Sequence, residues 1–195
     1  MSIIAIAGSP SARSRSNALL RYAAQALSQQ HGSVDSLGIR DVSAEDLVHG
    51  NYASEDAARL RQRVTPARVV LIATPVYKAS FAGGLKALLD LLDQTALAGK
   101  IVLPLATGGS AAHLLALEYS LKPVLSALGA RHILAGVYAT EAQVQVDEQG
   151  NAQLDEDIRV RLDAAIEAVS QLLPARTASR PYDLGRLASQ LQLAV

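Results

Sequence analysis

The amino-acid sequence is poor in the residues that most often carry redox chemistry or bind metals by themselves. Its 195 residues include no cysteine and no tryptophan, and only one phenylalanine and one methionine. Without cysteine the protein can form neither a disulfide framework, nor a thiolate metal site, nor a CxxC redox pair. If its chemistry is redox chemistry, a cofactor must therefore carry the electrons.

An excess of charge of either sign and long apolar runs are also missing. Eighteen Lys and Arg balance eighteen Asp and Glu, so the formal net charge is 0 and no overall field favours nucleic acid or an anionic membrane. The first apolar run, from Ile3 to Ala7, has no basic residue before it and is far too short for a signal segment or a membrane span. We expect a cytoplasmic protein that binds neither nucleic acid nor membranes. Any anion that it binds must be held by a local cluster of residues.

What the sequence does contain is an alternation of apolar β-branched runs with alanine- and leucine-rich stretches of helical periodicity. This alternation is typical of βαβ units around a parallel sheet. We predict strands at residues 2–8, 33–39, 68–74, 100–106 and 131–138 and helices at 16–30, 54–64, 82–93, 111–128 and 155–173. Right-handed crossovers then favour an α/β three-layer sandwich with a five-stranded parallel sheet in the flavodoxin-like order 2-1-3-4-5. Residues 1–173 would form this domain, and residues 174–195, which lose the alternation, a C-terminal tail.

The loop after the first strand is rich in hydroxyl groups. Between Ser9 and Asn17 the chain has four serines, an asparagine and two arginines, just before a predicted helix. Helix N-termini offer free N–H groups and a dipole that favours anions, so we predict a phosphate-binding loop. The loop has neither the GxxxxGK of a P-loop nor the GxGxxG of a dinucleotide-binding unit. The alternative is that Ser14 or Ser16 only caps the helix.

Two further loops follow the third and fourth strands, at the edge of the sheet where ligands bind in such folds. The first contains Tyr77 and leads into Gly83 and Gly84, and the second runs from Thr107 to Ser110 through two glycines. A flat ring could lie against the tyrosine while the glycine backbone donates to its polar edge. The alternatives are a tyrosine that only covers the end of the sheet, and glycines that only allow close packing and a tight turn.

Together, these loops resemble those of a known family. The segments GSPSARSRS, TPVYKASFAGGLK and ATGGS are similar to the GSxxxxSRS, TPxYKAxxxGxLK and ATGGS motifs of the NADPH-dependent FMN reductases. The resemblance covers roughly residues 2–173 and is most specific between Ala73 and Leu128. It is closest to the flavin reductases that serve two-component alkanesulfonate monooxygenases.

The resemblance implies roles for particular residues and two cofactors, FMN and NADPH. It assigns the FMN phosphate to Ser9, Arg15, Ser16 and Asn17, the loop along the isoalloxazine to Pro75, Val76, Tyr77 and Lys78, and the loop at the pyrimidine edge to Thr107, Gly108, Gly109 and Ser110. No residue is assigned as a catalytic acid or base, because hydride passes directly from nicotinamide to flavin. Arg13 is left without a role.

The implied activity is NADPH-dependent reduction of FMN, with the reduced flavin passed to a partner monooxygenase in alkanesulfonate desulfonation. Two alternatives remain. One is a quinone or azo-compound reductase that retains its FMN, and the other is a flavodoxin-like electron carrier, although such carriers are usually acidic.

The four histidines, His31, His49, His113 and His132, show no metal-ligand spacing, so we predict no metal site. His113 lies close after the Gly-Gly loop and would approach the flavin or lie on a helix surface.

The predicted helix from Ala111 to Leu128 is apolar on more than one face and contains Pro123. We expect this proline to kink or widen the turn around Tyr119. An apolar second face suggests a subunit interface, and the resemblance implies a homodimer or homotetramer that is paired through this helix. A helix fully buried in a monomer is the alternative.

Overall fold

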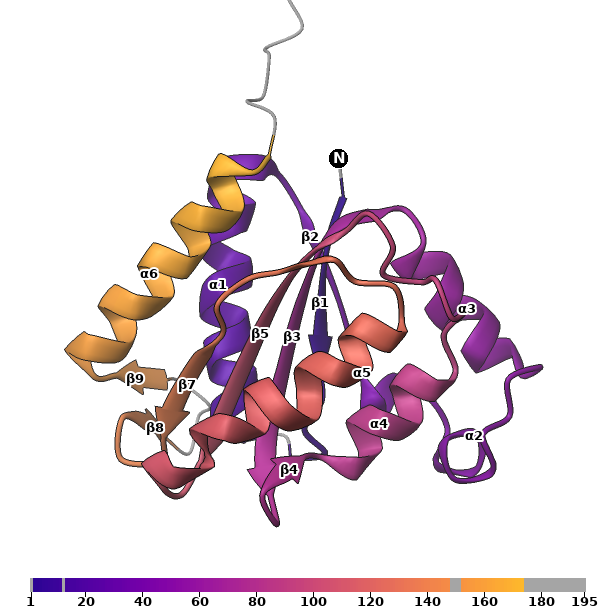
Figure 1. Ribbon diagram of the computed structural model, residues 1–195, viewed down its shortest axis with the longest axis horizontal. Helices are drawn as coiled ribbons and strands as arrows, with labels where there is room; N and C mark the ends of the chain where they lie inside the picture. Colours follow the sequence, from indigo (N-terminus) through magenta and orange to yellow (C-terminus); the bar gives the residue numbers. More distant parts are fainter. Residues whose placement is uncertain (1, 12, 148–151, 174–195) are drawn as a thin grey trace, which may run out of the picture.

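A parallel β-sheet forms the centre of the computed structural model, which describes residues 2–11, 13–147 and 152–173 (Figure 1). Its strands are β1 (Ser2–Ala7), β2 (Val34–Gly38), β3 (Ala67–Tyr77), β5 (Ile101–Gly108), β6 (His132–Ile133) and β7 (Val137–Thr140). The order is β2-β1-β3-β5, with β6 and β7 both on the free side of β5. The predicted α/β fold and the strand order 2-1-3-4-5 are confirmed, with β6 and β7 sharing the fifth position.

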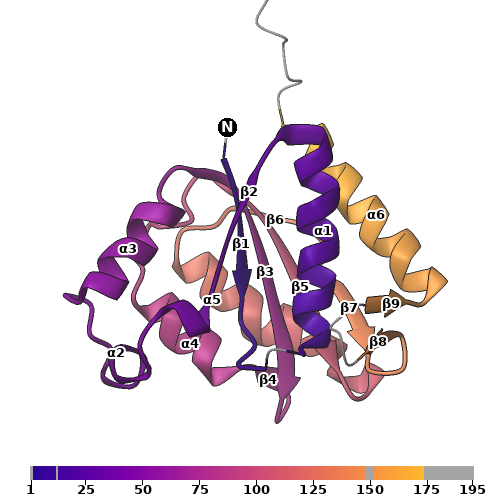
Figure 2. The same cartoon turned by 180° about the vertical axis from the view of Figure 1, so that it is seen from behind.

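The two faces of the sheet are covered by different helices, which makes three layers (Figures 1 and 2). The helices α1 (Arg15–His31) and α6 (Glu156–Gln171) lie on one face, whereas α3 (Glu55–Val64), α4 (Gly83–Asp90) and α5 (Lys122–Ala127) lie on the other. In β1, Ile3 and Ala5 pack under α1, and Ile4 and Ile6 pack under α3 and α4. This alternation explains why the strand reads as a continuous apolar run, since both of its faces are buried.

The helices α1 and α6 are also joined by polar contacts across a long sequence separation. The Tyr22 hydroxyl donates to Asp163 at 2.8 Å, and His31 Nε2 lies 3.0 Å from the Ser170 hydroxyl. The two helices therefore form one unit on that face of the sheet.

The fifth predicted strand, 131–138, is not continuous. Pro104 of β5 has no N–H to donate to a neighbouring strand, and at Gly136 a Cβ would lie 2.7 Å from the Pro104 carbonyl oxygen. Pairing therefore stops after Ile133 and resumes at Val137.

Smaller elements were not predicted. They are the short helix α2 (Ala44–His49), the strand β4 (Ser80–Phe81), which pairs antiparallel with the end of β3, and the hairpin of β8 (Val144–Val146) and β9 (Ala152–Leu154). The predicted helix 82–93 is also shorter, since α4 ends at Asp90.

The predicted helix 111–128 has three parts. It begins as a 3-10 turn over Ala111–Leu114, passes through a π-helical turn over Leu117–Leu121 and becomes regular only in α5. The N–H of Lys122 donates to Leu117, five residues back, just before Pro123, which has no N–H. The predicted widening of the turn around Tyr119 is confirmed.

In the part of the chain that the structure describes, no helix is both long and apolar enough to cross a membrane. The predicted tail, residues 174–195, lies outside the described residues.

Candidate functional site

The carboxyl ends of β1, β3, β5 and β7 meet around a small cavity of about 140 Å³. Its walls come from the loop after β1, the end of β3, the end of β5 and the residue after β7. The lining residues are Ser9, Ser11, Arg13, Ser14, Arg15, Pro75, Val76, Tyr77, Thr107, Gly108 and Glu141. Three loops that are distant in the sequence are thus brought to one place, as the sheet order requires.

The loop after β1 is held by its own hydroxyl groups. Ser14 is the N-cap of α1, its hydroxyl accepts the N–H of Asn17 at 3.3 Å, and it lies 2.9 Å from the Ser16 hydroxyl. Ser9 Oγ accepts the N–H of Ser11 at 3.2 Å. Ser14 therefore does cap the helix, and the fully buried Ser16 supports that cap behind the cavity wall.

The first turn of α1 is suited to an anion. The first turn of α1 has no acidic residue and begins at Arg15, whereas α2, α3 and α6 each have two acidic residues there. The helices α4 and α5 also lack acidic residues in the first turn. The positive end of the helix dipole is therefore not neutralised by a carboxylate on α1 itself.

Arg15 is held by the segment that follows β7. Its Nε donates to the Val144 carbonyl oxygen at 3.1 Å, and a terminal nitrogen lies 3.6 Å from the Glu141 carboxylate. Both side chains are about half exposed, at 43% and 56%, so the ion pair is weak and can be exchanged for another anion.

The end of β3 forms a tight hairpin with β4. Val76 pairs with Phe81 and Tyr77 with Ser80, so Lys78 and Ala79 are the two turn residues, with φ of 50° and 64°. Two consecutive positive φ values fit a two-residue hairpin turn of the type that usually requires Asn or Gly. The turn is thus built from residues that resist this conformation, and it holds the Tyr77 ring at the edge of the cavity, 52% exposed.

The end of β5 is fixed by Tyr138 of β7. The buried Tyr138 hydroxyl donates to the Ser110 carbonyl oxygen at 2.6 Å, and a Cβ at Gly108 would lie 2.5 Å from that hydroxyl. Burial first, and then the Glu141 carboxylate, raise the pKa of Tyr138, so the hydroxyl keeps its proton and remains a donor. At Gly109, by contrast, a Cβ would meet nothing within 4 Å, which leaves that backbone open to a ligand.

The structure brings most of the predicted site residues to this cavity, but not all of them. Ser9, Arg15, Pro75, Val76, Tyr77, Thr107 and Gly108 line it. Lys78 lies exposed at the hairpin turn, Gly109 and Ser110 follow the end of β5 on the surface, and Ser16 is buried. Asn17 lines a different cavity, which shares Ser9 with this one.

Two residues near the site were not found from the sequence, Glu141 and Arg40. Glu141 directly follows β7, and Arg40 lies two residues after the end of β2, in the 3-10 turn Ile39–Asp41. A position shortly after a strand was the available signal. His113 does not line either cavity, and its Nδ1 is buried without a hydrogen-bond partner. Within the described ranges, no group of His, Asp and Glu side chains is placed to hold a metal ion.

Comparison with known proteins places this fold among the flavodoxin-like oxidoreductases. The crystal structure of an NADH:FMN oxidoreductase in its apo form superimposes with a TM-score of 0.78 at 36% identity, over 92% of this chain and 93% of that one. The family model described as NADPH-dependent FMN reductase matches residues 1–145. The chain belongs to the NADPH-dependent FMN reductase family.

Relatives of similar length agree with this assignment. A protein named FMN reductase (NADPH) from Pseudomonas putida is 46% identical over 192 residues, which is 98% of this chain and 96% of that protein. Another of the same name, from Escherichia coli, is 44% identical over 181 residues, 93% of this chain and 94% of that protein.

Proposed function

We propose that this protein transfers hydride from NADPH to FMN and then releases the reduced flavin to a partner monooxygenase, one that desulfonates alkanesulfonates. It is an enzyme of the FMN reductase class, as its family shows. The release of flavin and the nature of the partner are the proposed parts. The observation that carries the release of flavin is the small size of the cavity.

The cavity can enclose only part of a flavin nucleotide. Its volume of about 140 Å³ is below the roughly 300–1,000 Å³ that is typical of pockets which enclose a whole small ligand. The phosphate end would be enclosed by Ser9 and Arg15, and the ring would lie along the half-exposed Tyr77 and the open backbone at Gly109. A flavin held mainly by its phosphate is accessible to a second substrate and can leave.

The residues of the chain act here by binding and orienting. Bound FMN supplies the hydride acceptor, and transfer from the nicotinamide requires no acid or base on the reacting carbon. Arg15 and the N-terminus of α1 hold the phosphate, Val76 and Tyr77 form the wall along the ring, and the backbone from Gly108 to Ser110 offers N–H groups to its polar edge.

The test of flavin release compares retention with turnover. We expect the purified chain to lose FMN on dialysis and to oxidise NADPH only when FMN is added, with saturation in FMN as for a substrate. A protein that keeps stoichiometric FMN through dialysis and turns over without added flavin would instead support the quinone or azo reductase. One that passes electrons singly to a protein acceptor would support the electron carrier.

The phosphate assignment is tested with Arg15→Ala. Loss of a charge-assisted hydrogen bond should weaken FMN binding by about 1.5–3 kcal/mol, while riboflavin, which has no phosphate, should bind both proteins equally. Arg68→Ala, which changes an exposed arginine at the amino end of β3, is the control. Equal FMN affinity of the parent and Arg15→Ala would refute the assignment.

We also propose that the protein forms a homodimer or homotetramer through the segment around Tyr119. Leu114, Leu115 and Tyr119 are exposed by 45%, 57% and 78%, and together they form an apolar surface of the kind that partners cover. The Ser80 hydroxyl lies 2.6 Å from the Ser120 hydroxyl, so this surface is joined to the hairpin that carries Tyr77.

The oligomer is tested by sedimentation of the parent and Tyr119→Ala. We expect the parent to sediment as a dimer or tetramer, and the variant to dissociate more readily and to change its FMN affinity through the Ser80–Ser120 contact. Tyr52→Ala, at another exposed tyrosine, should leave association unchanged. A parent that is monomeric at micromolar concentration contradicts the proposal. The cytoplasm, where NADPH is the common reductant, is the proposed location.

A further inference from the structure

The small cavity has a buried floor and an exposed rim. Ser9, Ser14 and Thr107 lie on the floor and are 2%, 5% and 4% exposed. The lining residues that form the rim are exposed, and they are Ser11, Arg13, Arg15, Tyr77 and Glu141. A group inside the cavity therefore has hydroxyl groups beneath it and the two arginines on its solvent side.

The floor retains a hydrogen-bond donor for an anion. Ser9 Oγ accepts the N–H of Ser11 at 3.2 Å, so the proton of the Ser9 hydroxyl is available to a phosphate. In the proposed function the flavin ring lies along Tyr77, at the end of β3, and the phosphate lies beside the loop after β1. A group attached to the far side of the phosphate would therefore leave the cavity past the exposed residues of that loop.

The two arginines of the rim differ in what they already bind. Arg15 donates to the Val144 carbonyl oxygen and pairs with Glu141. Arg13, by contrast, has no hydrogen bond or ion pair with any of the described residues. Because the one carboxylate that lines the cavity pairs with Arg15, the charge of Arg13 remains to be balanced by a ligand.

A cation on the rim can distinguish two kinds of phosphate ester. A phosphate monoester, as in FMN, carries a charge of about −1.5 to −2 at pH 7 and has three free oxygens. The flavin-linked phosphate of FAD is esterified on both sides, so it has less charge and one free oxygen fewer. The oxygen that is lost is the one that faces away from the flavin.

We propose that Arg13 selects flavins that end in a phosphate, so that FMN binds in preference to FAD. Its guanidinium binds the outer phosphate oxygen, the one that carries the adenosine half in FAD, whereas Arg15 and the first turn of α1 bind the inner oxygens. This inference rests on the proposed function only in placing the phosphate between Ser9 and Arg15. It depends neither on the reductant nor on the release of flavin.

The experiment measures the binding of oxidised flavins without turnover. FMN, riboflavin 5′-(methyl phosphate) and FAD are titrated calorimetrically into the full-length chain freed of flavin. The methyl ester lacks the free outer oxygen but adds no adenosine, so it separates loss of that oxygen from steric exclusion. We expect the parent to bind FMN at least about tenfold more tightly than either diester. In Arg13→Ala only FMN should lose affinity, which leaves the three flavins within about twofold of one another.

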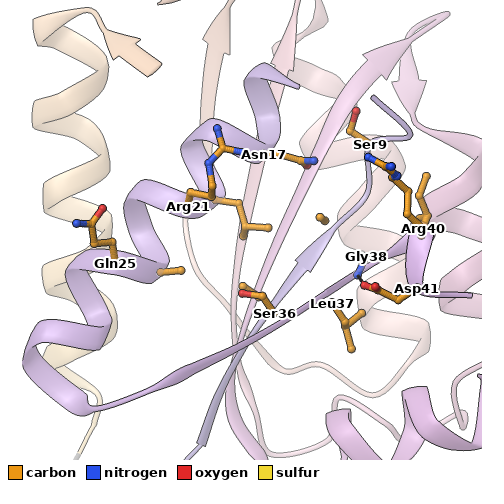
Figure 3. Close-up of a pocket in the computed structure, with 14 residues that line it drawn as sticks. Ser9, Asn17, Arg21, Gln25, Ser36, Leu37, Gly38, Arg40 and Asp41 are labelled. Carbon is orange, nitrogen blue, oxygen red and sulfur yellow. Dashed lines mark hydrogen bonds between the residues drawn. The ribbon is translucent and has the colours of Figure 1, made fainter. Parts of the chain in front are cut away.

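Three variants serve as controls. Arg13→Lys retains the charge and should keep most of the preference for FMN. Arg40→Ala removes another exposed arginine, which lines the neighbouring cavity that shares Ser9 (Figure 3), and it should leave all three affinities unchanged. Arg15→Ala should weaken FMN and both diesters alike, because its contact does not require the outer oxygen. The thermal midpoint of Arg13→Ala should equal that of the parent, since the Arg13 side chain is exposed.

Three results would overturn the proposal. They are equal binding of FMN and the methyl ester by the parent, an unchanged preference for FMN in Arg13→Ala, and a loss of FMN affinity in Arg40→Ala as large as in Arg13→Ala. The last result would show a general effect of positive charge rather than a contact.

Failure of this inference and failure of the proposed function can be told apart. If the preference for FMN depends on Arg13 but FMN stays bound through dialysis and turnover, the proposed release of flavin fails while the role of Arg13 stands. If flavin is released as proposed but Arg13→Ala keeps the preference, the role of Arg13 fails alone.

Discussion

The loops after β3 and β5 form neighbouring walls of the small cavity, and they are stabilised in opposite ways. The loop after β5 is fixed by close packing of Gly108 on Tyr138 and by the hydrogen bond from that tyrosine to Ser110. The loop after β3 is a hairpin with Lys78 and Ala79 in the left-handed region. One wall is thus held at low strain, whereas the other is held in place against its own backbone preference.

The two walls should therefore tolerate substitutions differently. Packing at Gly108 leaves no room for another atom, so adding a side chain there should destabilise the folded protein. The hairpin turn is strained, so a residue that favours positive φ there should stabilise the folded protein.

The largest effect is expected from Gly108→Ala. The new Cβ would lie 2.5 Å from the Tyr138 hydroxyl and 3.3 Å from Val76 Cβ, and overpacking of this kind typically costs about 1–3 kcal/mol. Urea unfolding measures the loss. Gly109→Ala is the matched control, because its Cβ would meet nothing within 4 Å. Equal stabilities of the two variants would mean that Tyr138 moves aside easily and that this wall is not fixed.

A smaller effect of opposite sign is expected from Ala79→Gly. Glycine adopts positive φ without steric cost, and after its greater unfolded-state entropy is subtracted the folded protein should gain about 0.5–1 kcal/mol. Ala58→Gly, in the regular helix α3, should instead lose a similar amount. If both variants lose stability, the hairpin turn is not strained. FMN affinity measured on Ala79→Gly then shows whether the strain has a role in positioning Tyr77.

The smallest effect is expected from Glu141→Gln, next to the fixed wall. The carboxylate pairs with Arg15 and would repel a flavin phosphate, so its removal should tighten FMN binding. The half-exposed pair limits the gain to about 0.2–1 kcal/mol, or roughly fivefold at most. High salt should shrink the difference between the two proteins. Glu45→Gln, on α2, is the control. Weaker FMN binding by Glu141→Gln would mean that the ion pair positions Arg15.

The central strands could be predicted from the sequence because their burial on both faces requires continuous apolar runs, as in β1, β3 and β5. Because ligands bind at the carboxyl ends of parallel strands, the positions of the ligand-binding loops could then be predicted as well. The interruption of the fifth strand could not be foreseen, because it depends on Pro104 and Gly136 meeting across a register that only the fold defines. Pro123 was different, since a missing N–H acts locally, and the widened turn before it followed from the sequence.

In the candidate site, too, local features could be predicted from the sequence and features that depend on the tertiary fold could not. Hydroxyl groups and arginines concentrated between Ser9 and Asn17 could be recognised as a phosphate-binding segment. Asn17 and Arg40 line a second cavity, whereas Glu141 lines the first. These placements depend on how the helices and loops pack against the sheet. Single residues that follow short or irregular strands form no sequence motif. Only the structure shows that they lie near the site.

The contacts between α1 and α6 bear on the order in which this protein is made. Tyr22 and His31 find their partners at Asp163 and Ser170, residues that a ribosome adds about 140 positions later. During synthesis, α1 therefore has an uncovered side until nearly the whole domain has emerged, and contacts of such large sequence separation form slowly. The nascent chain should depend on chaperones for longer than its size suggests, and truncation before α6 should leave a species that aggregates.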